Sequence, residues 1–263
     1  MTNLTAAIWI ELRKATRSRM PLLTGVGFLL VPLATGFIMY IYKNPDLARA
    51  AGLISAKANL IGGTADWPTY LNMLAQAVAI GGIFLFTLIG GWVFGREFAD
   101  GTLKDLLALP VSRSTILLAK FIVIALWSAA LTLMILVAGL IMGVLVDLPQ
   151  GSVEVVVGGS VTLAVTAFMV VAVVTPMALF ASIGRGYLLP IGIAVLALMF
   201  AIVLLTGLAG WGSYFPWAVP AIYAEAGGAT ANLEPVSYAI VLLTGLAGVV
   251  GTYLWWQRAD QSR

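Results

Sequence analysis

Long uncharged stretches of the chain alternate with short segments that carry nearly all of the charged residues. Each of six such stretches is long enough for the helix of about 20 residues that crosses the hydrocarbon layer of a bilayer. The fifth stretch, residues 186–224, is too long for one span and must contain a further element. We predict six transmembrane helices, near residues 22–42, 70–95, 116–146, 154–183, 187–208 and 236–256.

An amphipathic helix is predicted ahead of the first span, over residues 3–19. On a helical wheel Leu4 and Ile8 share one face, and Arg13 and Arg17 share another. A helix of this kind lies in the plane of the membrane surface. The alternative is an ordinary positively charged flank that orients the first span.

Composition supports an all-α integral membrane protein with a single transmembrane domain. Hydrophobic residues make up 61% of the 263 residues and charged residues only 10%, whereas soluble domains carry about 25% charged residues. The chain has no cysteine and no histidine, and it lacks the GxxxxGK[ST] loop that binds nucleotide phosphates. We therefore expect no catalytic, cofactor-binding or metal-binding residue, and no enzymatic activity on this chain.

The basic residues fall mainly on one side of the predicted membrane. With six spans both termini share a side, and that side carries eleven of the 14 lysines and arginines. The positive-inside rule then places both termini in the cytoplasm of a multi-pass protein of the plasma (inner) membrane. This placement accounts for the net charge of +3 by topology and anionic lipid, so nucleic-acid binding is not expected.

The six spans are predicted to hold no charged residue. Proton-coupled and ion-coupled carriers usually keep buried charged groups as coupling sites. This expectation argues against such a carrier. Serines, threonines and glycines within the spans are better explained by close packing between helices.

A short helix is predicted in the loop between the second and third spans, over residues 102–109. Gly101 permits the turn out of the second span, Thr102 can cap the new helix, and Pro110 ends it. Three leucines then share one face of this helix: Leu103, Leu106 and Leu107. Such a face buries itself either in the lipid headgroup layer or in a groove of a partner protein.

Around this helix the sequence resembles the permeases of ABC-2-type transporters. The resemblance is carried by Glu97, Gly101-Thr102-Leu103-Lys104, Leu106-Leu107 and Pro110-Val111-Ser112-Arg113. It implies that residues 102–109 form a coupling helix that docks on a separate ATP-binding-cassette ATPase subunit, which would hold ATP and Mg. It also implies that the three leucines face the ATPase, that Glu97 and Gly101 shape the elbow, and that residues 3–19 match the connecting helix of the family.

Residues 209–235 form a long segment on the outer side, rich in aromatic residues and prolines. By the same resemblance this segment is expected to be a re-entrant hairpin that gates the outer exit. The alternative is an aromatic loop at the membrane surface. The gate candidates are Trp211, Phe215, Pro216, Trp217 and Pro220. Residues 43–66 are longer than the short outer turn typical of the family, and their role is not assigned.

The resemblance implies a permease subunit of an ATP-driven exporter that works with a second permease chain, identical or different. An uncharged pathway favours a hydrophobic or amphipathic cargo such as a drug, a lipid or a peptide antibiotic. Two alternatives stay open: a secondary carrier or channel that works without ATP, and a membrane scaffold or sensor that does not transport.

One ten-residue sequence, AIVLLTGLAG, occurs twice, at residues 201–210 and 239–248. The flanking residues do not match, and the two copies lie in spans that run in opposite directions. An inverted-repeat transporter would need matching halves. We interpret the repeat as a local duplication or as drift, and no function is assigned to it.

Overall fold

The computed structural model describes residues 3–46, 52, 64–107, 110–208, 210–226 and 233–258, and these residues contain no strand. Six helical stretches within them are long and apolar enough to cross a membrane, so the predicted all-α membrane fold is confirmed. They are α2 (Met20–Lys43), α4 (Trp67–Ala99), α6 (Arg113–Leu145), the consecutive pair α7 (Val153–Val174) and α8 (Pro176–Ile183), α9 (Leu188–Gly207) and α11 (Pro235–Arg258).

Shorter helices lie outside the six spans. They are α1 (Asn3–Thr16), α5 (Leu103–Leu107), the 3-10 helix η1 (Trp211–Tyr214) and α10 (Val219–Tyr223). Helix α1 falls within the predicted helix 3–19, and α5 falls within the predicted coupling helix 102–109, of which residues 108 and 109 lie outside the described residues. Most of residues 43–66, and residues 209 and 227–232 of the outer segment, also lie outside them.

Three of the spans begin at a polar side chain that caps the helix. Asp66, Ser112 and Ser152 each accept a hydrogen bond from the backbone amide three residues further on. This contact satisfies one of the amide groups that has no partner inside the first turn. Helices α4, α6 and α7 therefore start where the sequence changes from a loop to an apolar run.

The fourth span is interrupted between α7 and α8, at Thr175 and Pro176. A proline inside a helix removes one backbone hydrogen bond and clashes with the preceding turn, which ends or kinks the helix. The Thr175 hydroxyl donates to the carbonyl oxygen of Gly245 in α11, over 2.8 Å. The interruption is therefore held against the last span.

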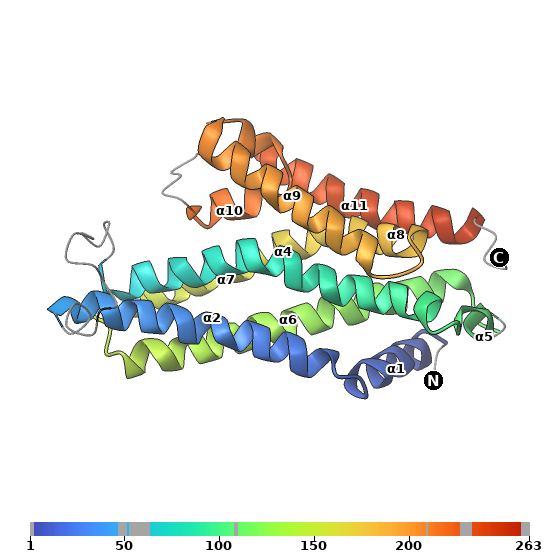
Figure 1. The fold of residues 1–263 in the computed structure, drawn as a ribbon, viewed down its shortest axis with the longest axis horizontal. Coiled ribbons are helices and arrows are strands. Elements are labelled where there is room, and N and C mark those ends of the chain that lie inside the picture. The colour runs from blue at the N-terminus through green and yellow to red at the C-terminus, as the bar shows by residue number, and fades with distance from the viewer. Residues whose placement is uncertain are drawn as a thin grey trace.

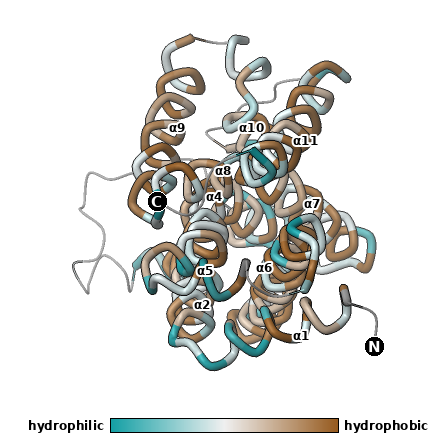
Figure 2. The backbone as a smooth tube through the Cα atoms, turned by 90° about the vertical axis from the view of Figure 1, so that its right-hand side faces the viewer, coloured by the Kyte–Doolittle hydropathy of each residue, from teal (hydrophilic) through white to brown (hydrophobic). Residues whose placement is uncertain are grey.

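Helix α4 lies at the centre of the bundle and is its most buried span. Helices α7, α2 and α6 pack against it, and α9 and α11 lie on one side (Figure 1). Helices α1 and α5 and the last turn of α11 gather at one end of the molecule, and α10 lies toward the other. Viewed from the α1 and α5 end, α9 is mostly hydrophobic (Figure 2), and only a small share of its residues is buried within the protein, as a lipid-facing helix requires.

Candidate coupling and gating sites

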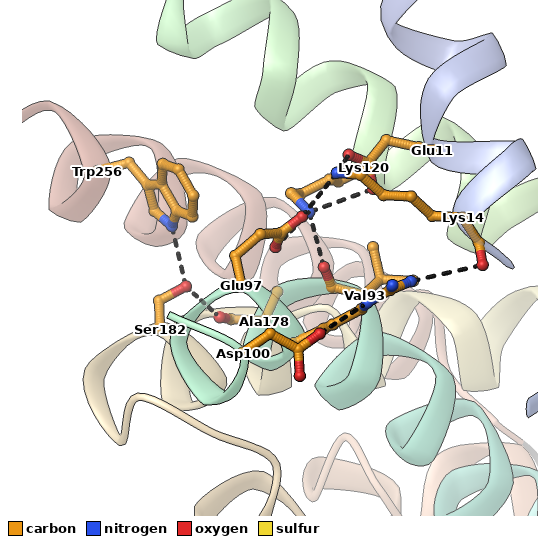
Figure 3. Close-up of polar contacts among 10 residues, drawn as sticks. Glu11, Lys14, Val93, Glu97, Asp100, Lys120, Ala178, Ser182 and Trp256 are labelled. Atoms are coloured by element: carbon orange, nitrogen blue, oxygen red, sulfur yellow. Dashed lines mark hydrogen bonds and ion pairs between the residues drawn. The ribbon is translucent and has the colours of Figure 1, made fainter. Parts of the chain in front are cut away.

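A buried cluster of charged side chains joins α1, α4 and α6 (Figure 3). Lys120 of α6 is 0% exposed and lies 2.8 Å from each carboxylate oxygen of Glu97. Its ammonium group also donates to the carbonyl oxygen of Val93, over 2.7 Å, and lies 3.3 Å from a carboxylate oxygen of Glu11. Because an ammonium group has three donors, these contacts leave none of them unused.

Lys14 of α1 completes the cluster from its more exposed side. Its ammonium group lies 2.7 Å from Glu11 and 3.0 Å from Glu97. Burial disfavours the charge on Lys14, but the carboxylates of Glu97 and Glu11 outweigh it and raise the pKa of Lys14 above its ordinary value. Two carboxylates thus face two ammonium groups, and the cluster is electrically balanced.

The prediction that no span holds a charged residue is wrong at Lys120. This residue lies inside α6, and already inside the predicted span 116–146, with its charge directed into the protein. Removing one partner of a buried ion pair typically costs about 3–5 kcal/mol, because the other charge is left buried and uncompensated. The cluster therefore fixes how α1, α4 and α6 sit together.

Opposite charges near the facing ends of two adjacent spans are the sequence signal that could have revealed this cluster. Glu97 precedes the loop between α4 and α6 and Lys120 follows it, so two antiparallel helices bring them to the same level. The sequence pointed less clearly to Glu11 and Lys14 as members of the cluster, because their spacing shows only that they share one face of α1.

Helix α5 follows the cluster directly. Gly101 takes a φ of +70°, the left-handed conformation that glycine adopts readily, and turns the chain out of α4. Thr102 is exposed, and its carbonyl oxygen accepts the amide of Leu106 over 3.1 Å. The predicted role of Glu97 and Gly101 at this elbow is compatible with their positions and remains a prediction.

Leu103 and Leu106 of α5 lie in different environments. Leu103 is only 7% exposed and belongs to the main hydrophobic core of the chain itself. Leu106 is partly buried and lines a small pocket with Ala7 and Ile10 of α1. The side chain of Leu107 lies outside the described residues. Among the side chains of α5 that the structure describes, those of Lys104 and Asp105 are exposed.

The end of α11 is tied to the same end of the bundle (Figure 3). The indole of Trp256 donates to the Ser182 hydroxyl of α8 over 2.9 Å, and its ring lies edge-on to Phe94 and Phe98 of α4. Arg113, at the start of α6, donates to the carbonyl oxygen of Trp256 over 2.7 Å. These contacts join the ends of α4, α6, α8 and α11 to one another.

At the other end, the described part of the outer segment consists of η1, α10 and the turns beside them. The ring of Phe215 packs edge-on against the ring of Phe200 of α9, with 5.0 Å between the ring centres, and its centre lies 5.3 Å from that of Trp217. Of the other gate candidates, Trp211 is 69% exposed, Pro216 is half-buried and Pro220 is buried. The structure thus brings Phe215 and Trp217 together and leaves Trp211 on the surface.

Two polar side chains of α4 hold the outer segment in place, and the sequence did not single them out. The Asn72 amide donates to the Glu225 carboxylate over 3.0 Å, and the Gln76 amide donates to the Glu225 carbonyl oxygen over 3.3 Å. Asn72 and Gln76 are four residues apart and share one face of α4. Polar residues at this spacing in an apolar helix were the available signal.

Comparison with known proteins decides the family. The model of the ABC-2 family of transporter proteins matches residues 7–203, which run from α1 through the four following spans into α9. The chain belongs to the ABC-2 family of transporter proteins. The resemblance found in the sequence is confirmed, and the chain is a membrane subunit of an ABC transporter.

Among curated proteins this ABC-2 subunit is similar to the bacitracin transport permease protein BCRB of Bacillus licheniformis. The two are 25% identical over 170 residues, which cover 65% of this chain and 80% of the relative. The family match also spans Lys14, Glu97 and Lys120 and the whole of α5, so the charged cluster and the short helix both lie within the part of the chain that is shared with the family.

Proposed function

We propose that this chain is the permease subunit of an ATP-driven exporter, which works with a separate ATP-binding-cassette ATPase subunit and a second permease chain. The family match carries the proposal. ATP and Mg would be bound by the ATPase partner. The proposed cargo is a hydrophobic or amphipathic compound such as a drug, a lipid or a peptide antibiotic. Bacitracin is the first compound to test, because the BCRB relative is named for its transport.

The proposed orientation has both termini in the cytoplasm of a plasma (inner) membrane. Eleven of the 14 lysines and arginines fall on that side of the six spans, as the positive-inside rule requires. Helix α1, helix α5 and the last turn of α11 lie at the same end of the bundle (Figure 1). An ATPase in the cytoplasm would therefore meet α5.

The route of coupling that we propose starts at α5 and continues through Glu97. Leu103 anchors α5 to the core, whereas Lys104 and Asp105 point outward and are free to meet the ATPase. Because Glu97 pairs with Lys14 of α1 and Lys120 of α6, displacement of the end of α4 also displaces these two helices. ATP can shift the permease between two states only through contacts that differ between those states.

A charge-swapped variant tests the docking surface. The double substitution K104E/D105K keeps the net charge and leaves Leu103 in place. We expect it to insert into the membrane normally, to lose at least tenfold in co-purification with the ATPase, and to abolish ATPase stimulation by cargo. The control is R258E, which alters an exposed charge on another helix, the last turn of α11, at the same end of the bundle (Figure 1). Unchanged ATPase binding and transport in K104E/D105K would refute the docking assignment.

One observation favours a second candidate, a carrier that works without ATP. The buried Lys120 and Glu97 form the kind of intramembrane ion pair that coupled carriers use. Vesicles that contain the purified chain and no ATPase separate the two functions. Cargo uptake driven by a proton or sodium gradient in such vesicles would support the carrier, and uptake that requires the ATPase and ATP would support the exporter.

A further inference from the structure

A strongly basic pocket of about 500 Å³ lies where the end of α1 meets the end of α4. Every charged side chain that lines it is basic. The lining bases are Arg13, Lys14, Arg17 and Arg96, and Trp9, Ile10 and Ser18 complete the wall. The charged cluster described above uses only Lys14 among these residues, so the pocket is a separate feature.

Two of the arginines lie over tryptophan rings. The guanidinium of Arg13 lies 4.9 Å from the ring centre of Trp9, and that of Arg96 lies 5.0 Å from the ring centre of Trp92. Arg96 also contacts the carboxylate of Asp100 over 3.1 Å. Arginine held in this way loses little freedom when its planar group binds an anion.

Positive charge in the pocket exceeds the negative charge around it. Among the described residues, Arg13 and Arg17 have no acidic side chain within ion-pair distance, and both are exposed. Arg96 has Asp100, and Lys14 has Glu11 and Glu97 on its buried side. The pocket therefore offers the charge of two unpaired guanidinium groups to an anion, and arginine pairs with phosphate through two parallel hydrogen bonds.

Apolar side chains beside the bases indicate where that anion comes from. Trp9 is 52% exposed and Ile10 is 41% exposed, and both line the pocket. Tryptophan concentrates at membrane surfaces, where its ring meets acyl chains and its N–H meets headgroups. A free phosphate would use the arginines but would leave these two side chains in water.

We propose that the pocket binds the phosphate headgroup of an anionic phospholipid of the cytoplasmic leaflet, with the guanidinium groups of Arg13, Arg17 and Arg96 on the phosphate and with Trp9 and Ile10 against the upper acyl chain. The site rests on the proposed orientation of the chain and is independent of docking by the ATPase. A bound lipid would bridge α1 and α4 beside Lys14, on the more exposed side of the charged cluster.

Lipid binding by the purified full-length chain tests the site. Native mass spectrometry is run with phosphatidylglycerol and with phosphatidylcholine on the unmodified chain, on R13Q/R17Q and on the control R185Q/R258Q. The control also removes two exposed bases from the same end of the molecule. We expect R13Q/R17Q to bind phosphatidylglycerol about thirtyfold more weakly, and we expect the control and all phosphatidylcholine binding to change less than twofold.

Three results would overturn the proposal. One is equal loss of phosphatidylglycerol in both double variants, which would indicate general charge attraction. Another is equal affinity for phosphatidylglycerol and soluble glycerol phosphate, which would show that the acyl chains and Trp9 contribute nothing. The third is lost ATPase binding with unchanged lipid binding in R13Q/R17Q, which would assign the pocket to the protein partner. Equal unfolding midpoints for the three proteins show that the comparison is made on folded chains.

Discussion

The same ten residues, AIVLLTGLAG, adopt two different structures in this protein. At residues 201–210 the helix ends at Gly207, and Gly210 takes a φ of +93° that turns the chain into the outer segment. At residues 239–248 all ten residues are helical and lie inside α11. An identical local sequence therefore does not decide where a membrane helix ends.

The two copies also bury different faces. In the first copy Ala201 and Leu204 are buried, and Ala201 packs with residues of the outer segment. In the second copy Val241, Gly245 and Gly248 are buried. The difference comes from the partners, because α11 lies against the interrupted span α7–α8, whereas α9 ends beside η1. Neighbouring helices set both the buried face and the helix end.

The largest expected effect is at Gly248. A methyl group there would lie 2.4 Å from the backbone nitrogen of Pro176 and 2.4 Å from the Thr175 hydroxyl, so α8 and α11 must separate. We expect G248A to lower the free energy of unfolding in detergent by about 1–3 kcal/mol, as overpacked sites do. Gly192 of α9 has no neighbour within 4 Å, and G192A is the matched control. Equal stability of G248A and G192A would contradict the close approach.

A smaller effect is expected at Gly210, the equivalent residue of the first copy. A methyl group there meets nothing within 4 Å, so the cost is only that of the left-handed backbone, about 1–2 kcal/mol for a residue with a side chain. We expect G210A to lower the unfolding midpoint and G210N to lower it less, because asparagine tolerates this conformation better than alanine. Identical midpoints for the two variants would show that backbone strain is not the cause.

The spans were predictable from the sequence because each is an apolar run long enough to cross a bilayer and bounded by charged residues. The turn at Gly101 was also readable, since glycine adopts the left-handed conformation readily. A proline alone did not decide where a span breaks, because α2 continues through Pro32 whereas the fourth span is interrupted at Pro176. Lys120 was readable only as a candidate partner of Glu97, because a charge near the end of an apolar run looks the same in the sequence whether it points to water or into the protein. Its pairing with Glu97 depends on how two helices pack.

The candidate sites divide in the same way. The short helix after Gly101 could be predicted from local signals. The burial of Leu103 in the core of its own chain could not, because an apolar helix face is the same in sequence whether lipid, a partner protein or the chain itself covers it. At the outer end, the aromatic and proline content of the segment was visible in the sequence. Its attachment to Asn72 and Gln76 required the position of Glu225 beside α4.

The smallest change in stability is expected at the seventh residue of each copy, Gly207 and Gly245. This pair compares the two copies most directly. Gly245 lies against α7, where a methyl group would be 3.3 Å from both the side chain and the carbonyl oxygen of Ala172, whereas at Gly207 a methyl group meets nothing within 4 Å. Alanine gains up to about 1 kcal/mol over glycine in a helix. At Gly207 nothing opposes this gain, and at Gly245 the contact with Ala172 offsets it.

We therefore expect G207A to raise the free energy of unfolding by about 0.5 kcal/mol and G245A to leave it unchanged or lower it. The two substitutions replace the same residue within the same ten-residue sequence, but Gly207 is the last residue of α9 and Gly245 lies inside α11. Helix propensity therefore favours alanine more at Gly245, so a more stable G207A than G245A reports the packing of α11 on α7. Thermal unfolding of both variants in one detergent measures this difference. A gain in stability for both would mean that α7 moves aside at no cost, and the separate environments of the two copies would then not explain their separate structures.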